Sequence, residues 1–310
     1  MSIYGRHDRR QSGTQKGTPM TTHQVIRNHV LATLFTAVAF ATAGVASAAP
    51  AKTGYARSGD LDLYYEIHGS GGTPVVLLHG SLCTIDICFG QVIPRLAEKR
   101  RVIAFEQQGH GHTRLLPKHP FSITQMVKDT VAVMNQLGVN KADIVGYSTG
   151  AAVALELALT HPQLVNKVTL ISGAYEKSGA RKEMLELMPK LTVEMMKQTP
   201  WYDAYKKVAP KDNYDQLVER VKKIDDSKTY SEEAIRALKS PVQLIVADSD
   251  IIYLDHAVKF FRLLGGDVPG DLVPRPKSQL AIIPGATHVT MMLEKSPLVV
   301  GMIVAFLDGN

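Results

Sequence analysis

Short apolar segments alternate with longer helical patterns after residue 55, and this alternation constrains the fold more than any other feature. The segments are Leu61–Ile67, Val75–Leu78, Arg101–Phe105, Ala142–Val145, Lys167–Ser172, Val242–Ala247 and Gln279–Ile283. Strands buried on both faces are nearly continuous apolar runs, because helices cover both sides of a parallel sheet. We therefore expect an α/β fold with a mostly parallel, doubly wound sheet.

Residues 175–240 do not show this alternation of strand and helix patterns. They contain four helical patterns, near 181–189, 192–207, 214–224 and 231–239. This segment predicts a helical cap inserted into a core formed by residues 49–174 and 241–310. A cap over the strand ends would supply an apolar pocket, and the expected pocket residues are Leu82, Tyr147, Met195, Trp201 and Tyr202. The same aromatic and methionine side chains would alternatively only pack the cap onto the core.

The first 48 residues have the order of a secretory signal peptide. A basic region precedes an apolar stretch that begins at Val30, and the small-residue segment Ala46-Ser47-Ala48 follows. We expect cleavage after Ala48 and export to the periplasm or the medium, with Met1 and Met20 both open as the start. An uncleaved membrane anchor is the weaker alternative, because the stretch is rich in Ala and Thr.

The basic charge of the chain belongs largely to this leader. Residues 1–48 carry five basic side chains and one acidic side chain, a net +4 of the chain's +6. The remaining +2, without a basic stripe, argues against a nucleic-acid partner. Cys83 and Cys88 are five residues apart. Export permits a disulfide, but on one regular helix the pair would point to different faces. We therefore favour two buried thiols, with a disulfide as the alternative.

One strand-to-helix junction carries a motif for covalent catalysis. Gly146-Tyr-Ser148-Thr-Gly150 fits the pattern G-x-S-x-G, in which a sharp turn exposes a serine hydroxyl. A serine hydroxyl is a weak nucleophile unless a base, oriented by an acid, activates it. Sites in parallel sheets form beyond the carboxyl ends of strands. Asp250 follows one downstream strand and His288 follows the next, so the sequence predicts a triad of Ser148, His288 and Asp250. Asp248 is the competing acid.

These motifs resemble the α/β-hydrolase superfamily over about residues 55–308. His79-Gly80 resembles the motif of the loop that forms half of the oxyanion hole, and Gly285-Ala-Thr-His288 resembles the histidine loop. Ala247-Asp-Ser-Asp250 resembles the acid loop. Gln108-Gly-His-Gly111 resembles an R-G-x-G segment, with Gln108 where arginine is usual. The resemblance implies the serine esterase or haloperoxidase-like branch with a helical cap.

The resemblance also implies roles for individual residues. Ser148 would attack an acyl carbonyl, His288 would act as base and Asp250 would orient the imidazole. Backbone N–H groups of Thr149 and Ser81 would hold the oxyanion, with Leu82 as the alternative to Ser81. His79 would shape its loop rather than take part in chemistry. The histidines at 110 and 112 have poor spacing for a metal site, and we expect neither metal nor cofactor.

The leading functional hypothesis is a carboxylic ester hydrolase for small to medium apolar esters. A lactonase, including one for acyl-homoserine lactones, or a cofactor-free perhydrolase would use the same residues. A ligand-binding receptor with a vestigial triad is the alternative that is not an enzyme. We expect a small-molecule ester or lactone as partner, and no stable membrane association after cleavage. The oligomeric state and the acyl and alcohol specificity stay open.

Overall fold

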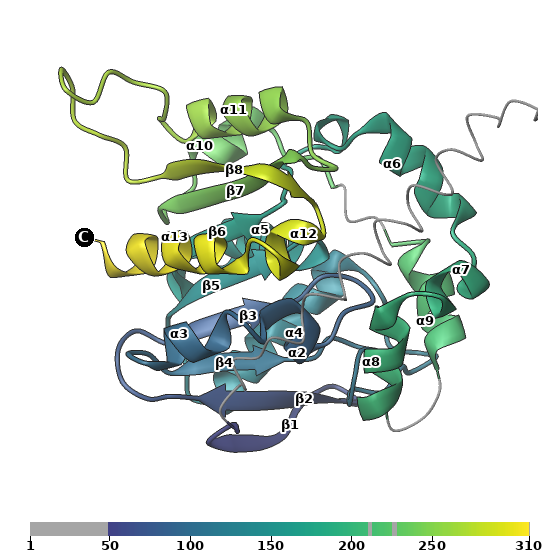
Figure 1. Ribbon diagram of the computed structural model, residues 1–310. Helices are drawn as coiled ribbons and strands as arrows, with labels where there is room; N and C mark the ends of the chain where they lie inside the picture. The colour runs from purple at the N-terminus through teal and green to yellow at the C-terminus, as the bar shows by residue number, and fades with distance from the viewer. Residues whose placement is uncertain (1–48, 210–212, 225–227, 310) are drawn as a thin grey trace, which may run out of the picture.

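The computed structural model describes residues 49–209, 213–224 and 228–309 of the chain (Figure 1). The predicted signal peptide lies outside the described residues. Eight strands form one sheet in the order β1-β2-β4-β3-β5-β6-β7-β8. The strands are β1 Lys52–Ser58, β2 Leu61–His68, β3 Val75–Leu78, β4 Val102–Phe105, β5 Ala142–Tyr147, β6 Val165–Ile171, β7 Val242–Ser249 and β8 Gln279–Thr287.

Strands β3 to β8 run parallel, while β2 pairs antiparallel with both β1 and β4. The predicted α/β fold with a mostly parallel sheet is therefore confirmed. Strand β1 was not expected. Its sequence Lys-Thr-Gly-Tyr-Ala-Arg-Ser has few apolar residues because it forms the edge of the sheet and four of its seven residues are exposed.

Helices cover both faces of the sheet. Successive side chains of a strand point to opposite faces, so the fully buried β3 contributes Val76 and Leu78 to one apolar layer and Val75 and Leu77 to the other. The first layer is covered by α4 Ile123–Gln136, α5 Thr149–Thr160, α10 Glu232–Arg236 and α11 Leu254–Leu263. The second is covered by α2 Ile85–Phe89, α3 Ile93–Ala97, α12 Thr290–Leu293 and α13 Ser296–Asp308.

Between β6 and β7, the described residues form helices. They are α6 Lys182–Leu187, α7 Val193–Lys197, α8 Pro200–Val208, α9 Tyr214–Val221 and α10, with short 3-10 turns at Lys177–Gly179 and Met188–Lys190. Figure 1 shows α6 to α9 grouped at one side of the sheet. The helix expected over 192–207 is two helices, because a proline at 200 cannot donate an N–H within a continuous helix. That these helices act as a cap stays a prediction.

A third apolar cluster joins these helices to loops of the core. It contains Met196, Tyr205 and Tyr214 from the helical segment together with Leu82 and Leu115 from core loops. Among the described residues, no helix is both long and apolar enough to span a bilayer.

Candidate active site

Ser148 occupies the junction between β5 and α5. Its φ of 55° lies in the left-handed region, which is strained for a residue with a side chain. Gly146 and Gly150, two residues to either side, let the backbone of α5 approach the backbone of β3 and β5 closely. A Cβ on Gly146 would lie 2.2 Å from the carbonyl oxygen of Gly150, and a Cβ on Gly150 would lie 1.9 Å from that of Leu78. The local sequence thus places the Ser148 hydroxyl at the carboxyl end of the sheet.

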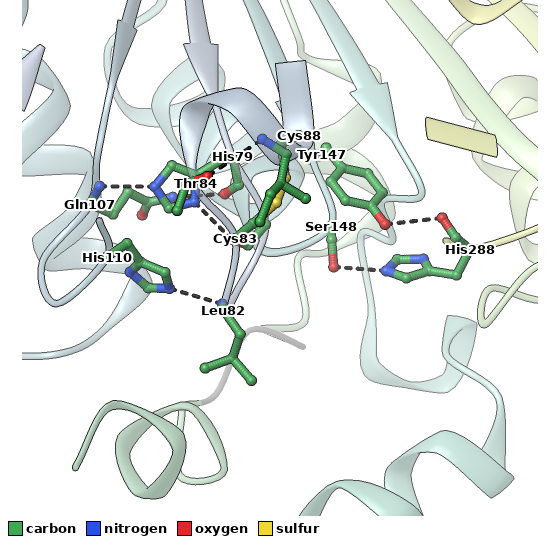
Figure 2. The surroundings of a disulfide bond; sticks show 12 residues. His79, Leu82, Cys83, Thr84, Cys88, Gln107, His110, Tyr147, Ser148 and His288 are labelled. Atoms are coloured by element: carbon green, nitrogen blue, oxygen red, sulfur yellow. Dashed lines mark hydrogen bonds between the residues drawn. A yellow bond between two sulfur atoms is a disulfide. The ribbon is translucent and has the colours of Figure 1, made fainter. Parts of the chain in front are cut away.

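Ser148, His288 and Asp250 are joined by hydrogen bonds. The Ser148 Oγ lies 3.1 Å from the Nε2 of His288 (Figure 2), and the Nδ1 of His288 lies 3.1 Å from the Oδ1 of Asp250. Asp250 is buried, with its Oδ2 accepting from the Ala247 N–H at 3.0 Å and its Oδ1 from the Ile251 N–H at 2.7 Å. Burial opposes its ionisation, but these bonds and the imidazole hold the pKa of Asp250 below its ordinary value.

Asp248 has a different position from Asp250. Its carboxylate is exposed and accepts from the Gly285 N–H at 2.7 Å and from the Ala286 N–H at 3.2 Å. These backbone hydrogen bonds lower the pKa of Asp248. Asp248 therefore holds the loop that leads to His288.

The loop after β3 carries the two candidate oxyanion donors. The Leu82 N–H donates to the Nε2 of His110 at 3.0 Å, so it is already engaged. The Ser81 hydroxyl lies 2.7 Å from the hydroxyl of Thr149, which brings Ser81 beside the start of α5. This arrangement favours Ser81 over Leu82 as the partner of Thr149 in an oxyanion hole.

Two buried histidines brace this loop against the loop after β4. The His79 Nε2 accepts from the Gln107 N–H at 3.0 Å, and its Nδ1 lies 2.8 Å from the carbonyl of Gly80. The His110 Nε2 accepts from Leu82, and its Nδ1 lies 3.0 Å from the carbonyl of Gln108. Both rings are therefore neutral with the proton on Nδ1. Burial lowers the pKa of His79 to about 4 and that of His110 to about 3.

Cys83 and Cys88 form a disulfide, and the favoured prediction of two buried thiols is wrong (Figure 2). The prediction assumed that both cysteines lie on one helix. Helix α2 begins only at Ile85, where the Thr84 side chain caps it by accepting from the Ile87 N–H. Cys83 thus lies outside the helix, and the two Cα atoms are 6.2 Å apart. The bond ties the loop of Ser81 to α2.

The predicted pocket residues have varied surroundings. Tyr147 is buried in the second apolar layer, and its hydroxyl donates to the carbonyl of His288 at 3.0 Å. Its ring stacks on the His288 ring with centroids 5.1 Å apart. Leu82 is buried in the third cluster, against which Trp201 and Tyr202 pack while half-buried. Met195 is also half-buried. That these side chains line a substrate pocket stays a prediction, as do the absence of a metal and of a cofactor.

One polar residue at the site was missed from the sequence. The Ser172 hydroxyl donates to the Asp250 Oδ1 and lies 2.8 Å from the Nδ1 of His288. The rule that sites form at the carboxyl ends of parallel strands applies to Ser172 as well, since it directly follows β6.

Comparison with known proteins supports the architecture. Residues 73–213 match a family model described as alpha/beta hydrolase fold. A protein of Azorhizobium caulinodans named "Putative carbamate hydrolase RutD" is 34% identical over 137 residues, which cover 44% of this chain and 51% of that protein. A 2-hydroxymuconate semialdehyde hydrolase of Pseudomonas sp. is 35% identical over 111 residues, covering 35% and 39% respectively. The chain thus spans about half or less of the length of these relatives.

Solved structures match over a larger share of the chain. A meta-cleavage product hydrolase of Pseudomonas fluorescens covers 84% of this chain and 98% of its own, with a TM-score of 0.65 and 21% identity. An enol-lactonase of Burkholderia xenovorans covers 83% and 100%, with a TM-score of 0.61 and 19% identity. The sheet order, the serine turn and these comparisons agree, and the chain has the α/β-hydrolase fold.

Proposed function

We propose that this chain is a serine hydrolase that cleaves carboxylic esters of small to medium apolar substrates. The observation that carries the proposal is the continuous hydrogen-bonded chain from the Ser148 Oγ through both ring nitrogens of His288 to the buried Asp250. A base within hydrogen-bond reach of the nucleophile, itself oriented by a third group, is the arrangement that activates a serine.

This geometry supports the following reaction. The Ser148 Oγ attacks the carbonyl carbon of the ester while its proton passes to the Nε2 of His288. The resulting oxyanion is held by the backbone N–H groups of Ser81 and Thr149. The tetrahedral intermediate collapses, the alcohol leaves with the proton from Nε2, and an acyl group stays on Ser148. Water, deprotonated by the Nε2 of His288, then attacks the acyl carbon; the bond to the Ser148 Oγ breaks, Oγ takes the proton back from Nε2, and the acid leaves. Asp250 stays ionised throughout and stabilises the imidazolium.

The names of two relatives and one structural neighbour refer to different substrates: a carbamate, 2-hydroxymuconate semialdehyde and an enol lactone. An ester or a lactone presents the same acyl carbon to Ser148, so a lactonase is the second candidate, and a perhydrolase would replace water with peroxide. A receptor with an inactive triad is the candidate that predicts no turnover.

Hydrolysis of p-nitrophenyl acetate and butyrate tests the proposal. We expect turnover by the wild type and a loss of about 10⁴-fold or more in kcat for Ser148→Ala. Ser70→Ala is the matched control. Ser70 is exposed in the loop before the amino end of β3, whereas the Ser81 loop of the candidate site follows the carboxyl end of that strand. The proposal fails if a broad panel of esters and lactones is not hydrolysed, or if Ser148→Ala keeps the wild-type rate.

We further propose that residues 1–48 direct export. The apolar stretch and small-residue segment support this, as does the disulfide, since such bonds persist in oxidising compartments. Fractionation of expressing cells and N-terminal sequencing test it. A mature chain that begins at Ala49 in the periplasm or the medium is expected, and an intact leader in the cytoplasm would refute it.

A further inference from the structure

Four neighbouring strands are each followed by a polar residue at the carboxyl end of the sheet. Strands β5, β6, β7 and β8 lie side by side, and the residues that directly follow them are Ser148, Ser172, Asp250 and His288. The proposed mechanism uses three of these four. Ser172 follows β6, the strand between β5 and β7, and its side chain reaches both Asp250 and His288.

The Ser172 hydroxyl contacts the acid and the base together. It donates its proton to the Asp250 Oδ1, the same oxygen that lies 3.1 Å from the Nδ1 of His288. Its own oxygen lies 2.8 Å from that Nδ1. Because the hydroxyl gives its proton to the carboxylate, the Nδ1–H of His288 is shared between two acceptors, Asp250 and Ser172.

The backbone of Ser172 is strained to make this contact. Its φ is 57°, in the region that residues other than glycine rarely adopt. The Ser172 N–H donates to the carbonyl of Ile245 on β7 at 2.8 Å, and the side chain is buried. Strained conformations persist where the surroundings hold them, and they are common at functional sites.

We propose that Ser172 is a positioning residue, whose hydroxyl fixes the Asp250 carboxylate and the His288 ring relative to each other. The proposal rests on the function proposed above. The hydroxyl limits the rotation of the ring because it supplies a second acceptor for Nδ1–H. By donating a hydrogen bond to the Asp250 Oδ1, it also competes with the imidazolium for that carboxylate oxygen. Other charged groups nearby are Asp248, bound to the loop amides, and Arg181, whose Nε donates to the carbonyl of Asp250 at 2.7 Å.

Two substitutions separate the hydroxyl from the strain. Ser172→Ala removes the hydroxyl and keeps a side chain at positive φ, whereas Ser172→Gly removes the hydroxyl and relieves the strain. If the hydroxyl positions the triad, both variants lose about tenfold in kcat with KM changed by less than about twofold. The pH profile of kcat/KM should also change in both variants, because Asp250 loses a donor and the Nδ1–H of His288 loses an acceptor.

A spectroscopic measurement keeps this test separate from ester turnover. The downfield ¹H NMR signal of the His288 Nδ1–H should shift in both variants, and His288→Gln assigns that signal. If the wild type hydrolyses no ester but the signal still shifts in both variants, the proposed function fails and the positioning role stands. An Nδ1–H signal that stays at its wild-type position in both variants overturns the positioning role, and so does a return of wild-type kcat and pH profile in Ser172→Gly.

Discussion

Breaking the bond between Cys83 and Cys88 should lower the free energy of unfolding by about 2 kcal/mol. The two cysteines are five positions apart, so the bond closes a ring of six residues. The loop-entropy relation gives about 7 cal/mol/K for such a ring, or about 2 kcal/mol at 25 °C. In a domain of roughly 250 residues, this corresponds to a fall in Tm of about 4–8 °C.

Thermal unfolding followed by circular dichroism, with and without dithiothreitol, measures this difference. Cys83→Ala/Cys88→Ala is the matched control, because dithiothreitol should leave its Tm unchanged. Thiol titration in denaturant should detect no free thiol in the untreated wild type. Ester hydrolysis should also slow after reduction, mainly through kcat, because the bond lies two residues beyond Ser81 in the same loop. Equal Tm values for the oxidised and reduced wild type would refute the reasoning.

Substitutions at three further residues test other parts of the structure. His110→Ala should lower kcat roughly tenfold by freeing the Leu82 N–H and loosening the oxyanion loop, and His110→Gln, which keeps an acceptor, should lose less; steady-state kinetics decide. Arg100→Met should cost about 3 kcal/mol in urea unfolding, because it leaves the buried Asp143 carboxylate without the ion pair at 2.8 Å, whereas equal stability of Arg100→Met and wild type would contradict this. Hydrogen bonds outweigh burial and hold the pKa of Asp250 below its ordinary 3.8, so its contribution to stability is present above that pH and is lost as pH falls through the folded value. Urea unfolding of Asp250→Asn should therefore depend less steeply on pH than that of the wild type between about pH 5 and 2, and parallel profiles would count against it.

The residues of the candidate triad could be predicted because each depends on a local pattern. Ser148 is marked by glycines on both sides, and Asp250 and His288 follow strands whose apolar runs stand out in the sequence. Ser172 also follows such a strand. A lone serine carries no pattern of its own, and its contact with Asp250 depends on the backbone at Ser172 adopting a positive φ.

The disulfide and strand β1 show two other limits. Whether Cys83 and Cys88 meet depends on the residue at which α2 begins, and helix boundaries are the least certain part of any sequence-based prediction. Strand β1 is stabilised by pairing with β2, from Lys52 opposite Ile67 to Ser58 opposite Leu61. This pairing is tertiary information that the polar sequence of β1 does not carry.

The sheet order has a consequence for how the proposed site is assembled during folding. Among the described residues, β7 and β8, which precede the proposed acid and base, are the last two strands in chain order, and about 70 residues separate β7 from its neighbour β6. Pairings between such distant segments form slowly. During folding, β1 to β6 can therefore pair around Ser148 before His288, the proposed base, reaches it. A chain in which β1 to β6 have paired but β7 and β8 have not should be folded in large part but unreactive, so the reactivity of Ser148 would report the pairing of β7 and β8.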